Sequence, residues 1–68
     1  MTAVEIINAT LTQWGKKAIL KTANRDFIIP IVNANTVRWW SKFGVFGVWT
    51  HSGRLFIKPQ MVIGILPY

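Results

Sequence analysis

The sequence predicts a small, mainly β domain in which one short N-terminal α-helix precedes a strongly bent five-stranded antiparallel barrel. Apolar residues recur at helical spacing only near the start of the chain. After Gly15, short runs of β-favouring residues alternate with turn residues. A chain of 68 residues has room for one domain. We therefore expect a single domain over residues 1–68, with the helix at about 3–13 and the barrel at about 16–67.

The predicted helix begins with the spacing of a capping box. Thr2 would be the N-cap residue, and Glu5 stands three positions later. Gly15 is a natural stop after the last apolar residue of the stripe. The apolar stripe that should pack over a sheet consists of Val4, Ile7, Leu11 and Trp14.

The rest of the chain divides into short apolar segments separated by turn residues. The expected strands are residues 16–22, 27–32, 37–42, 45–50, 54–58 and 61–66. The expected turns or breaks are residues 24–26, 33–35, 43–44, 51–53 and 59–60. Pro30 has no backbone N–H to donate to a ladder, so it should lie at a sheet edge or a bulge. Five or six short strands of this kind suggest a small barrel.

The net charge of the chain indicates which kind of partner it attracts. Eight Lys and Arg residues stand against two Asp and Glu residues, which gives a net charge of +6. A field of this sign attracts polyanions such as nucleic acid. The longest apolar runs, residues 27–32 and 61–67, are far shorter than the roughly 20 residues that span a bilayer, so we expect no membrane partner. The absence of cysteine fits a reducing compartment, and we expect a cytoplasmic protein.

The short length predicts self-association. A chain of this size buries only about 60% of its unfolded surface, and small scaffolds usually need a disulfide, a metal or oligomerisation. Cysteine is absent, while 51% of the residues are hydrophobic and 13% are aromatic. Exposed apolar surface usually marks an interface. We therefore expect a homo-oligomer.

Three predicted strands share one pattern. Alternate residues of a strand lie on the same face. On one face each strand carries a cation, an apolar or aromatic residue and a second cation: Lys17, Ile19 and Lys21; Arg38, Trp40 and Lys42; Arg54, Phe56 and Lys58. Cations of this kind can follow phosphates while rings stack on unpaired bases. Two structural explanations of the same pattern stay open beside nucleic-acid binding. Lys protects edge strands from aggregation, and Trp and Arg are enriched at subunit interfaces.

No constellation of residues points to catalysis. His51 is alone and falls in a predicted turn. Glu5 and Asp26 are explained as a cap and a turn residue. No pair of residues could serve as acid and base or as nucleophile and base. We therefore predict no catalytic, cofactor or metal site and no enzymatic activity.

Residues 55–67 read LFIKPQMVIGILP. This segment resembles the last two strands of Sm-like proteins (Sm, LSm and Hfq), in which an apolar strand ends in lysine and a short turn leads to a second apolar strand. The resemblance implies an SH3-type barrel that closes into a ring, of five to seven subunits, by pairing these two strands between neighbours. It also implies binding of single-stranded RNA near the pore by two loops, here Asn33 and Asn35 with Lys58 and Gln60. Pro59 stands where Hfq proteins have a histidine.

The function predicted from the sequence is binding of single-stranded RNA or DNA by a homo-oligomeric Sm-like ring that serves nucleic-acid processing or chaperoning. The candidate binding residues are Asn33, Asn35, Arg38, Trp40, Lys42, Arg54, Phe56, Lys58 and Gln60. A monomeric or dimeric OB- or SH3-like barrel with the same ligand is one alternative. A small viral or mobile-element protein whose basic aromatic face binds another protein is the other.

Overall fold

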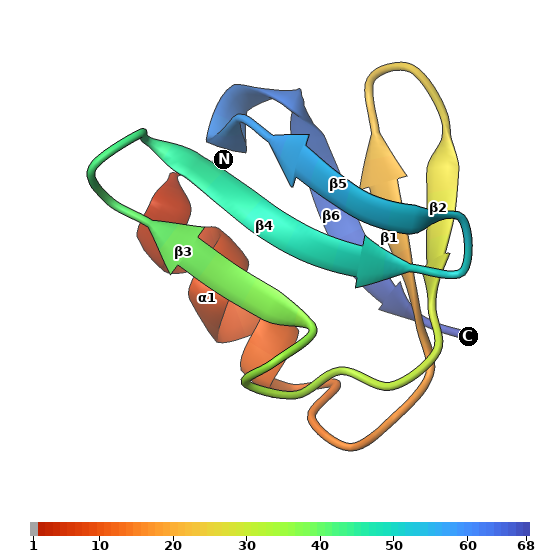
Figure 1. Ribbon diagram of the computed structural model, residues 1–68. Helices are drawn as coiled ribbons and strands as arrows, with labels where there is room; N and C mark the ends of the chain where they lie inside the picture. Colours follow the sequence, from red (N-terminus) through yellow and green to blue (C-terminus); the bar gives the residue numbers. More distant parts are fainter. Residues whose placement is uncertain (1) are drawn as a thin grey trace.

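One helix and six strands form the part of the chain that the computed structural model describes, residues 2–68 (Figure 1). The helix α1 spans Ala3–Leu11. The strands are β1 (Ala18–Thr22), β2 (Asp26–Ile29), β3 (Val37–Trp40), β4 (Val45–Thr50), β5 (Gly53–Ile57) and β6 (Val62–Pro67). A 3₁₀ turn, η1 (Pro59–Met61), joins β5 to β6. The predicted fold class, mainly β with a short N-terminal helix, is confirmed.

The strands form two three-stranded antiparallel sheets in the orders β2-β1-β6 and β3-β4-β5. A backbone hydrogen bond outside the ladders connects the two sheets: the N–H of His51, after β4, donates to the carbonyl of Ile28 in β2 at 3.0 Å. Within the second sheet, the N–H of Trp49 donates to the carbonyl of Thr36, just before β3, at 2.7 Å. Over residues 2–68 no continuous ladder closes the sheets into one barrel, and there are six strands instead of five. The predicted five-stranded barrel is therefore not confirmed.

The helix begins as predicted and ends earlier. The Thr2 hydroxyl accepts a hydrogen bond from the N–H of Glu5 at 3.2 Å, which confirms Thr2 as the N-cap. The helix stops at Leu11 rather than near residue 13, because the N–H groups of Gln13 and Trp14 bond three residues back instead of four, to the carbonyls of Thr10 and Leu11. Gly15 then adopts a positive φ of 78°, a conformation that favours glycine.

The helix packs through a different face from the predicted one. Ile6 (2% exposed) and Thr10 are its buried residues. The predicted stripe is turned toward solvent, and Leu11, for example, is 53% exposed. The prediction was wrong because apolar residues occupy two adjacent stripes of this helix. Thr10 can serve as a core residue because its hydroxyl donates to the carbonyl of Ile6 at 2.7 Å and is thereby satisfied.

The predicted strands are found, with their boundaries shifted by up to three residues. The 45–50 strand matches β4 at both ends. The 27–32 strand ends early, at Ile29, because Pro30 follows it, and β2 is an edge strand as Pro30 predicted. The 37–42 strand ends at Trp40, where a turn begins and Gly44 takes a φ of 64°.

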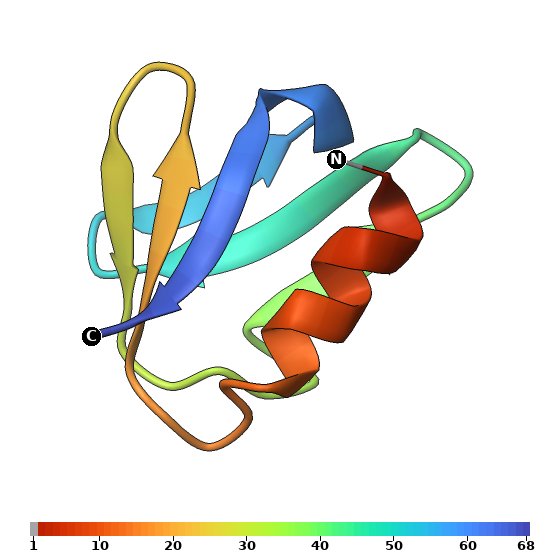
Figure 2. The same cartoon turned by 180° about the vertical axis from the view of Figure 1, so that it is seen from behind.

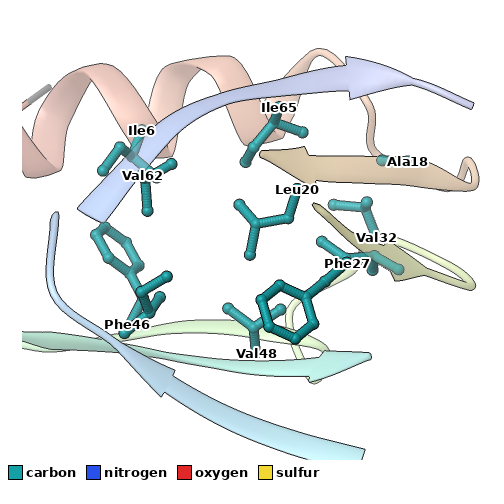
Figure 3. Close-up of a cluster of buried hydrophobic side chains, with 11 residues drawn as sticks. Ile6, Ala18, Leu20, Phe27, Val32, Phe46, Val48, Val62 and Ile65 are labelled. Carbon is teal, nitrogen blue, oxygen red and sulfur yellow. The ribbon is translucent and has the colours of Figure 1, made fainter. Parts of the chain in front are cut away.

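The hydrophobic core lies between the inner faces of the two sheets and is covered at one side by α1 (Figure 3). Figure 2 shows α1 running along the side of the molecule next to β6, with β3 behind it. Full burial of one such side chain contributes roughly 1.5–3 kcal/mol. The core residues are Ile6, Ala18, Leu20, Phe27, Ile29, Val32, Phe46, Val48, Ile57, Val62 and Ile65.

Candidate nucleic-acid interface

The outer face of the β3-β4-β5 sheet carries most of the predicted strand residues. Phe46 and Val48 of β4 point into the core, so their neighbours Gly47 and Trp49 point outward. The register places Gly47 between Arg38 of β3 and Phe56 of β5. We call this surface the arginine–aromatic face, and define it by Arg38, Trp40, Gly47, Trp49, Arg54 and Phe56.

Arg54 lies at the centre of this face. Its Cζ atom is 5.0 Å from the ring centroid of Phe56, 5.6 Å from that of Trp49 and 5.7 Å from that of Trp40. The Cζ atom of Arg38 is 5.8 Å from the Trp40 centroid. These distances fall within the roughly 6 Å range of cation–π attraction. Both arginines are exposed, so their guanidinium groups meet the rings while remaining open to solvent.

The rings differ in how open they are. Trp40 is half-buried, and its indole lies against Gly47, where an added Cβ would be only 2.8 Å from Nε1. Nε1 is buried and has no hydrogen-bond partner among the described residues. Trp49 and Phe56, by contrast, are 47% and 60% exposed. Trp40 therefore forms the floor of the face, whereas Trp49 and Phe56 expose ring surface to solvent.

Trp49 was not among the residues predicted from the sequence. The signal was present in residues 45–50, where apolar Phe46 and Val48 alternate with Gly47 and Trp49. Alternation of this kind assigns Trp49 to the face opposite Phe46. Residues 45–50 carry no cation, so they fall outside the pattern of cation, ring and cation from which the candidate residues were predicted.

Two predicted cations lie at the margin of this face. Lys42 is in the turn after β3, because the strand ends at Trp40, and its Nζ is 5.9 Å from the Phe43 ring centroid. Lys58 follows the last residue of β5 and is exposed. The strand alternation predicted for Lys42 is therefore wrong. The exposed Gln60 belongs to η1.

The two loops that the family resemblance brings together lie at opposite ends of the β3-β4-β5 sheet. The carbonyl of Thr36, in the loop of residues 33–36, accepts from the N–H of Trp49, which pairs with Arg54 near the start of β5. Lys58 and Gln60 come after Ile57, the last residue of β5. Figure 1 shows the β5–β6 connection at the end of β5 opposite to the β4–β5 hairpin. Within one chain the structure therefore does not form a joint site from them.

Asn33 has a local structural role. Its Oδ1 accepts hydrogen bonds from the N–H groups of Asn35 at 2.8 Å and Thr36 at 3.1 Å. This Asx-type arrangement is the turn predicted for residues 33–35. The side-chain oxygen of Asn33 is thus already hydrogen-bonded within the turn, whereas the side chain of Asn35 is exposed.

The third cationic strand belongs to the other sheet. In β1, Ala18 and Leu20 are buried while Ile19 and Lys21 face outward, as the alternation predicts. Ile19 and Lys21 therefore lie on the outer face of the β2-β1-β6 sheet. Lys17 precedes β1, and its Nζ atom is 3.9 Å from the Tyr68 ring centroid. The three cationic strands thus supply two separate surfaces rather than one.

The arginine–aromatic face is also free of acidic side chains. The sequence has two carboxylate side chains, Glu5 on α1 and Asp26 on β2. Neither α1 nor β2 is part of the β3-β4-β5 sheet. The potential of the face is therefore set by cations, which favours an anionic ligand. Among residues 2–68, His, Asp and Glu side chains form no group of three that could hold a metal ion. In the same residues, α1 is too short to cross a membrane, and no other helix could do so.

Comparisons with protein-family models, with curated proteins and with solved structures find no match to this chain.

Proposed function

We propose that this protein binds single-stranded RNA or DNA through the arginine–aromatic face. The observation that carries the proposal is the grouping of three rings around Arg54, with Arg38 beside them, on an exposed surface without a carboxylate. Unpaired bases stack on exposed aromatic rings, and phosphates bind the cations between them. A duplex offers no unpaired base for such rings, which is why a single strand is the expected ligand.

Each part of the face has a role in this proposal. Trp49 and Phe56 lie on neighbouring strands, and Phe56 is two residues along β5 from Arg54, the register partner of Trp49, so the two Cα atoms are roughly 7–8 Å apart. That spacing allows each ring to stack on a different base. Arg38 and Arg54 would contact phosphates, because a guanidinium group can donate to two phosphate oxygens at once. Lys42 and Lys58 would extend the cationic path at the two margins.

We further propose that the protein assembles as a homo-oligomer, in the finer form an Sm-like ring. Within the described chain β5 pairs with β4 alone and β6 with β1 alone, so each has one unpaired edge. Adding β5 of one subunit to β6 of the next would pair both edges. In such a ring the separated loops around Asn33 and Lys58 could meet across subunits. A cytoplasmic location remains part of the same proposal.

A protein-binding role is the second candidate, and one observation favours it. An apolar groove of about 220 Å³ lies between α1 and β3. Ile7, Leu11, Trp14 and Trp39 line it, and each is at least one-third exposed. Exposed apolar surface of this kind is typical of interfaces, either with another copy or with a different protein. The groove is distinct from the arginine–aromatic face, so both roles could be present in one molecule.

Fluorescence anisotropy with labelled U-rich and A-rich 12-mers of RNA and DNA tests the proposal. Protein of known mass from light scattering is titrated across a salt series. Trp49→Ala and Phe56→Ala should each weaken binding by about 1–3 kcal/mol, which is the usual loss of one stacked base. Ile63→Ala is the matched control, because Ile63 is 63% exposed on β6 and lies outside the face. Absence of binding at low salt by the folded protein would exclude the proposed function and favour the protein-binding role.

A further inference from the structure

A second cavity adjoins the arginine–aromatic face at the end of β5. It has a volume of about 320 Å³ and lies between the β1–β2 hairpin and the β5–η1 segment. Phe56 belongs to both the cavity and the face, so the two surfaces are continuous. The cavity is lined by Thr22, Asn24, Arg25, Phe27, Leu55, Phe56, Ile57, Lys58 and Met61.

The floor of this cavity is apolar. Phe27 and Ile57 are buried core residues, and Leu55 and Met61 pack half-buried against that core. A flat aromatic ligand would find contact on the floor without leaving a polar group of the protein unpaired. The volume is at the lower end of the roughly 300–1,000 Å³ of small-molecule sites, which suits a ligand the size of one nucleotide.

The rim of the cavity is cationic. Arg25 and Lys58 stand on its two sides, on the hairpin and after β5, and both are exposed. The Arg25 Cζ atom is 4.6 Å from the ring centroid of Phe27, so the guanidinium group lies over one residue of the floor. Neither Glu5 nor Asp26 lines the cavity. An apolar floor under two cations matches a ligand with an aromatic body and a negative group.

The wall that carries Arg25 is held in place by hydrogen bonds. The Thr22 hydroxyl donates to the Arg25 carbonyl at 2.6 Å and accepts from the Arg25 N–H at 3.2 Å. The N–H of Ala23 donates to the carbonyl of Met61 at 2.9 Å, which ties the hairpin to η1. The cavity is thus formed before a ligand arrives, so binding does not require the hairpin to fold around it.

We infer that this cavity takes one unstacked nucleobase of the bound strand, with the phosphate of that nucleotide on Arg25 and Lys58. The inference rests on the proposed function, since it extends the strand from Trp49 and Arg54 across Phe56 into the cavity. Asn24 is exposed at the rim, and its carboxamide has two donors and an acceptor with which to meet a base edge. Recognition of unpaired nucleotides usually combines stacking with hydrogen bonds of this kind.

Nuclear magnetic resonance with adenosine and uridine 5′-monophosphate, and with ribose 5-phosphate as the control, tests the cavity directly. A stacked base should shift the methyl signal of Met61 through its ring current and should shift the side-chain amide of Asn24. Ribose 5-phosphate has the phosphate and the sugar but no base, so it should leave the Met61 methyl unmoved. Equal shifts from ribose 5-phosphate and both nucleotides would show an anion site only and would overturn the inference.

Anisotropy with the 12-mers then connects the cavity to the strand. Asn24→Ala and Arg25→Gln should each reduce 12-mer affinity by about two- to tenfold, the usual effect of one lost hydrogen bond. Lys16→Gln is the matched control for Arg25→Gln, because Lys16 is also an exposed cation and lies outside the cavity. Circular dichroism confirms that each variant is folded.

The two proposals fail in different ways. If the 12-mer binds but Asn24→Ala and Arg25→Gln match Lys16→Gln and no nucleotide shifts Met61, the cavity inference is overturned and the proposed function stands. If a nucleotide shifts Met61 but no 12-mer binds, the cavity is a mononucleotide site and the proposed strand binding is overturned. If neither ligand binds, both are overturned.

Discussion

Gly47→Ala should destabilise the protein through one contact beneath the arginine–aromatic face. A Cβ at this position would lie 2.8 Å from Trp40 Nε1, 3.3 Å from Trp40 Cδ1 and 3.5 Å from an Arg54 guanidinium nitrogen. Ordinary contact begins at 3.4 Å, so the indole would have to retreat by at least 3.4 − 2.8 = 0.6 Å. Because Arg38 and Arg54 lie over the same ring, its displacement would disturb the whole face.

The magnitude is best measured against a second glycine. Overpacking by one methyl group typically costs about 1–3 kcal/mol. Replacing glycine by alanine also stabilises by about 0.4–1 kcal/mol, because the unfolded chain loses freedom. Gly64→Ala, in β6, should show only the stabilisation through the unfolded chain, because a Cβ at this position would have nothing within 4 Å. The difference in free energy of unfolding between the two variants should therefore be about 1–3 kcal/mol.

Urea denaturation monitored by circular dichroism gives both free energies of unfolding, and tryptophan fluorescence reports the altered surroundings of Trp40. Gly47→Ala should also bind the 12-mers more weakly than Gly64→Ala does. Equal stability of the two variants, within about 0.5 kcal/mol, would show that Trp40 does not rest on Gly47 and would refute the described geometry of the face.

Other substitutions test the remaining parts of the structure. Phe46→Ala should lower the free energy of unfolding, measured by urea denaturation, by about 3–5 kcal/mol. Phe43→Ala, which removes a ring that is 67% exposed, should lower it by less than about 0.5 kcal/mol. Similar values for the two variants would contradict the assignment of Phe46 to the core. Thr2→Ala should cost about 0.5–2 kcal/mol in the same assay, and an unchanged stability would mean that the cap contributes nothing. Lys58→Ala should reduce the slope of log K against log salt by about 0.7, the value for one phosphate contact on a single strand, and an unchanged slope would remove Lys58 from the binding path.

Much of the local structure could be predicted because it depends on neighbouring residues. The Thr2 cap, the strand over residues 45–50 and the turn at Asn33 each follow from side chains within a few positions. The outward placement of Arg54 and Phe56 could also be predicted from the sequence, because alternate residues of a strand lie on opposite faces whatever the strand pairs with.

The packing of the helix could not be predicted in the same way. Ile6 and Ile7 are both apolar and lie on adjacent stripes, so the period of 3.6 residues fits either stripe. Which stripe is buried depends on the surface that meets the helix. Here the buried stripe includes Thr10, a polar residue that the hydrophobic pattern passes over.

The order of the elements, the side of each strand on which its cations lie and the excess of positive charge can all be read from the sequence, because they are properties of composition or of short spacing. Which of these strands share a surface depends instead on the three-dimensional packing of the chain. Strand pairing brought Trp49 to Arg54 and separated residues 33–36 from Lys58, and packing of the two sheets placed Arg25 beside the end of β5. Each of these outcomes depends on hydrogen bonds and contacts between residues far apart in the chain, which no local pattern encodes.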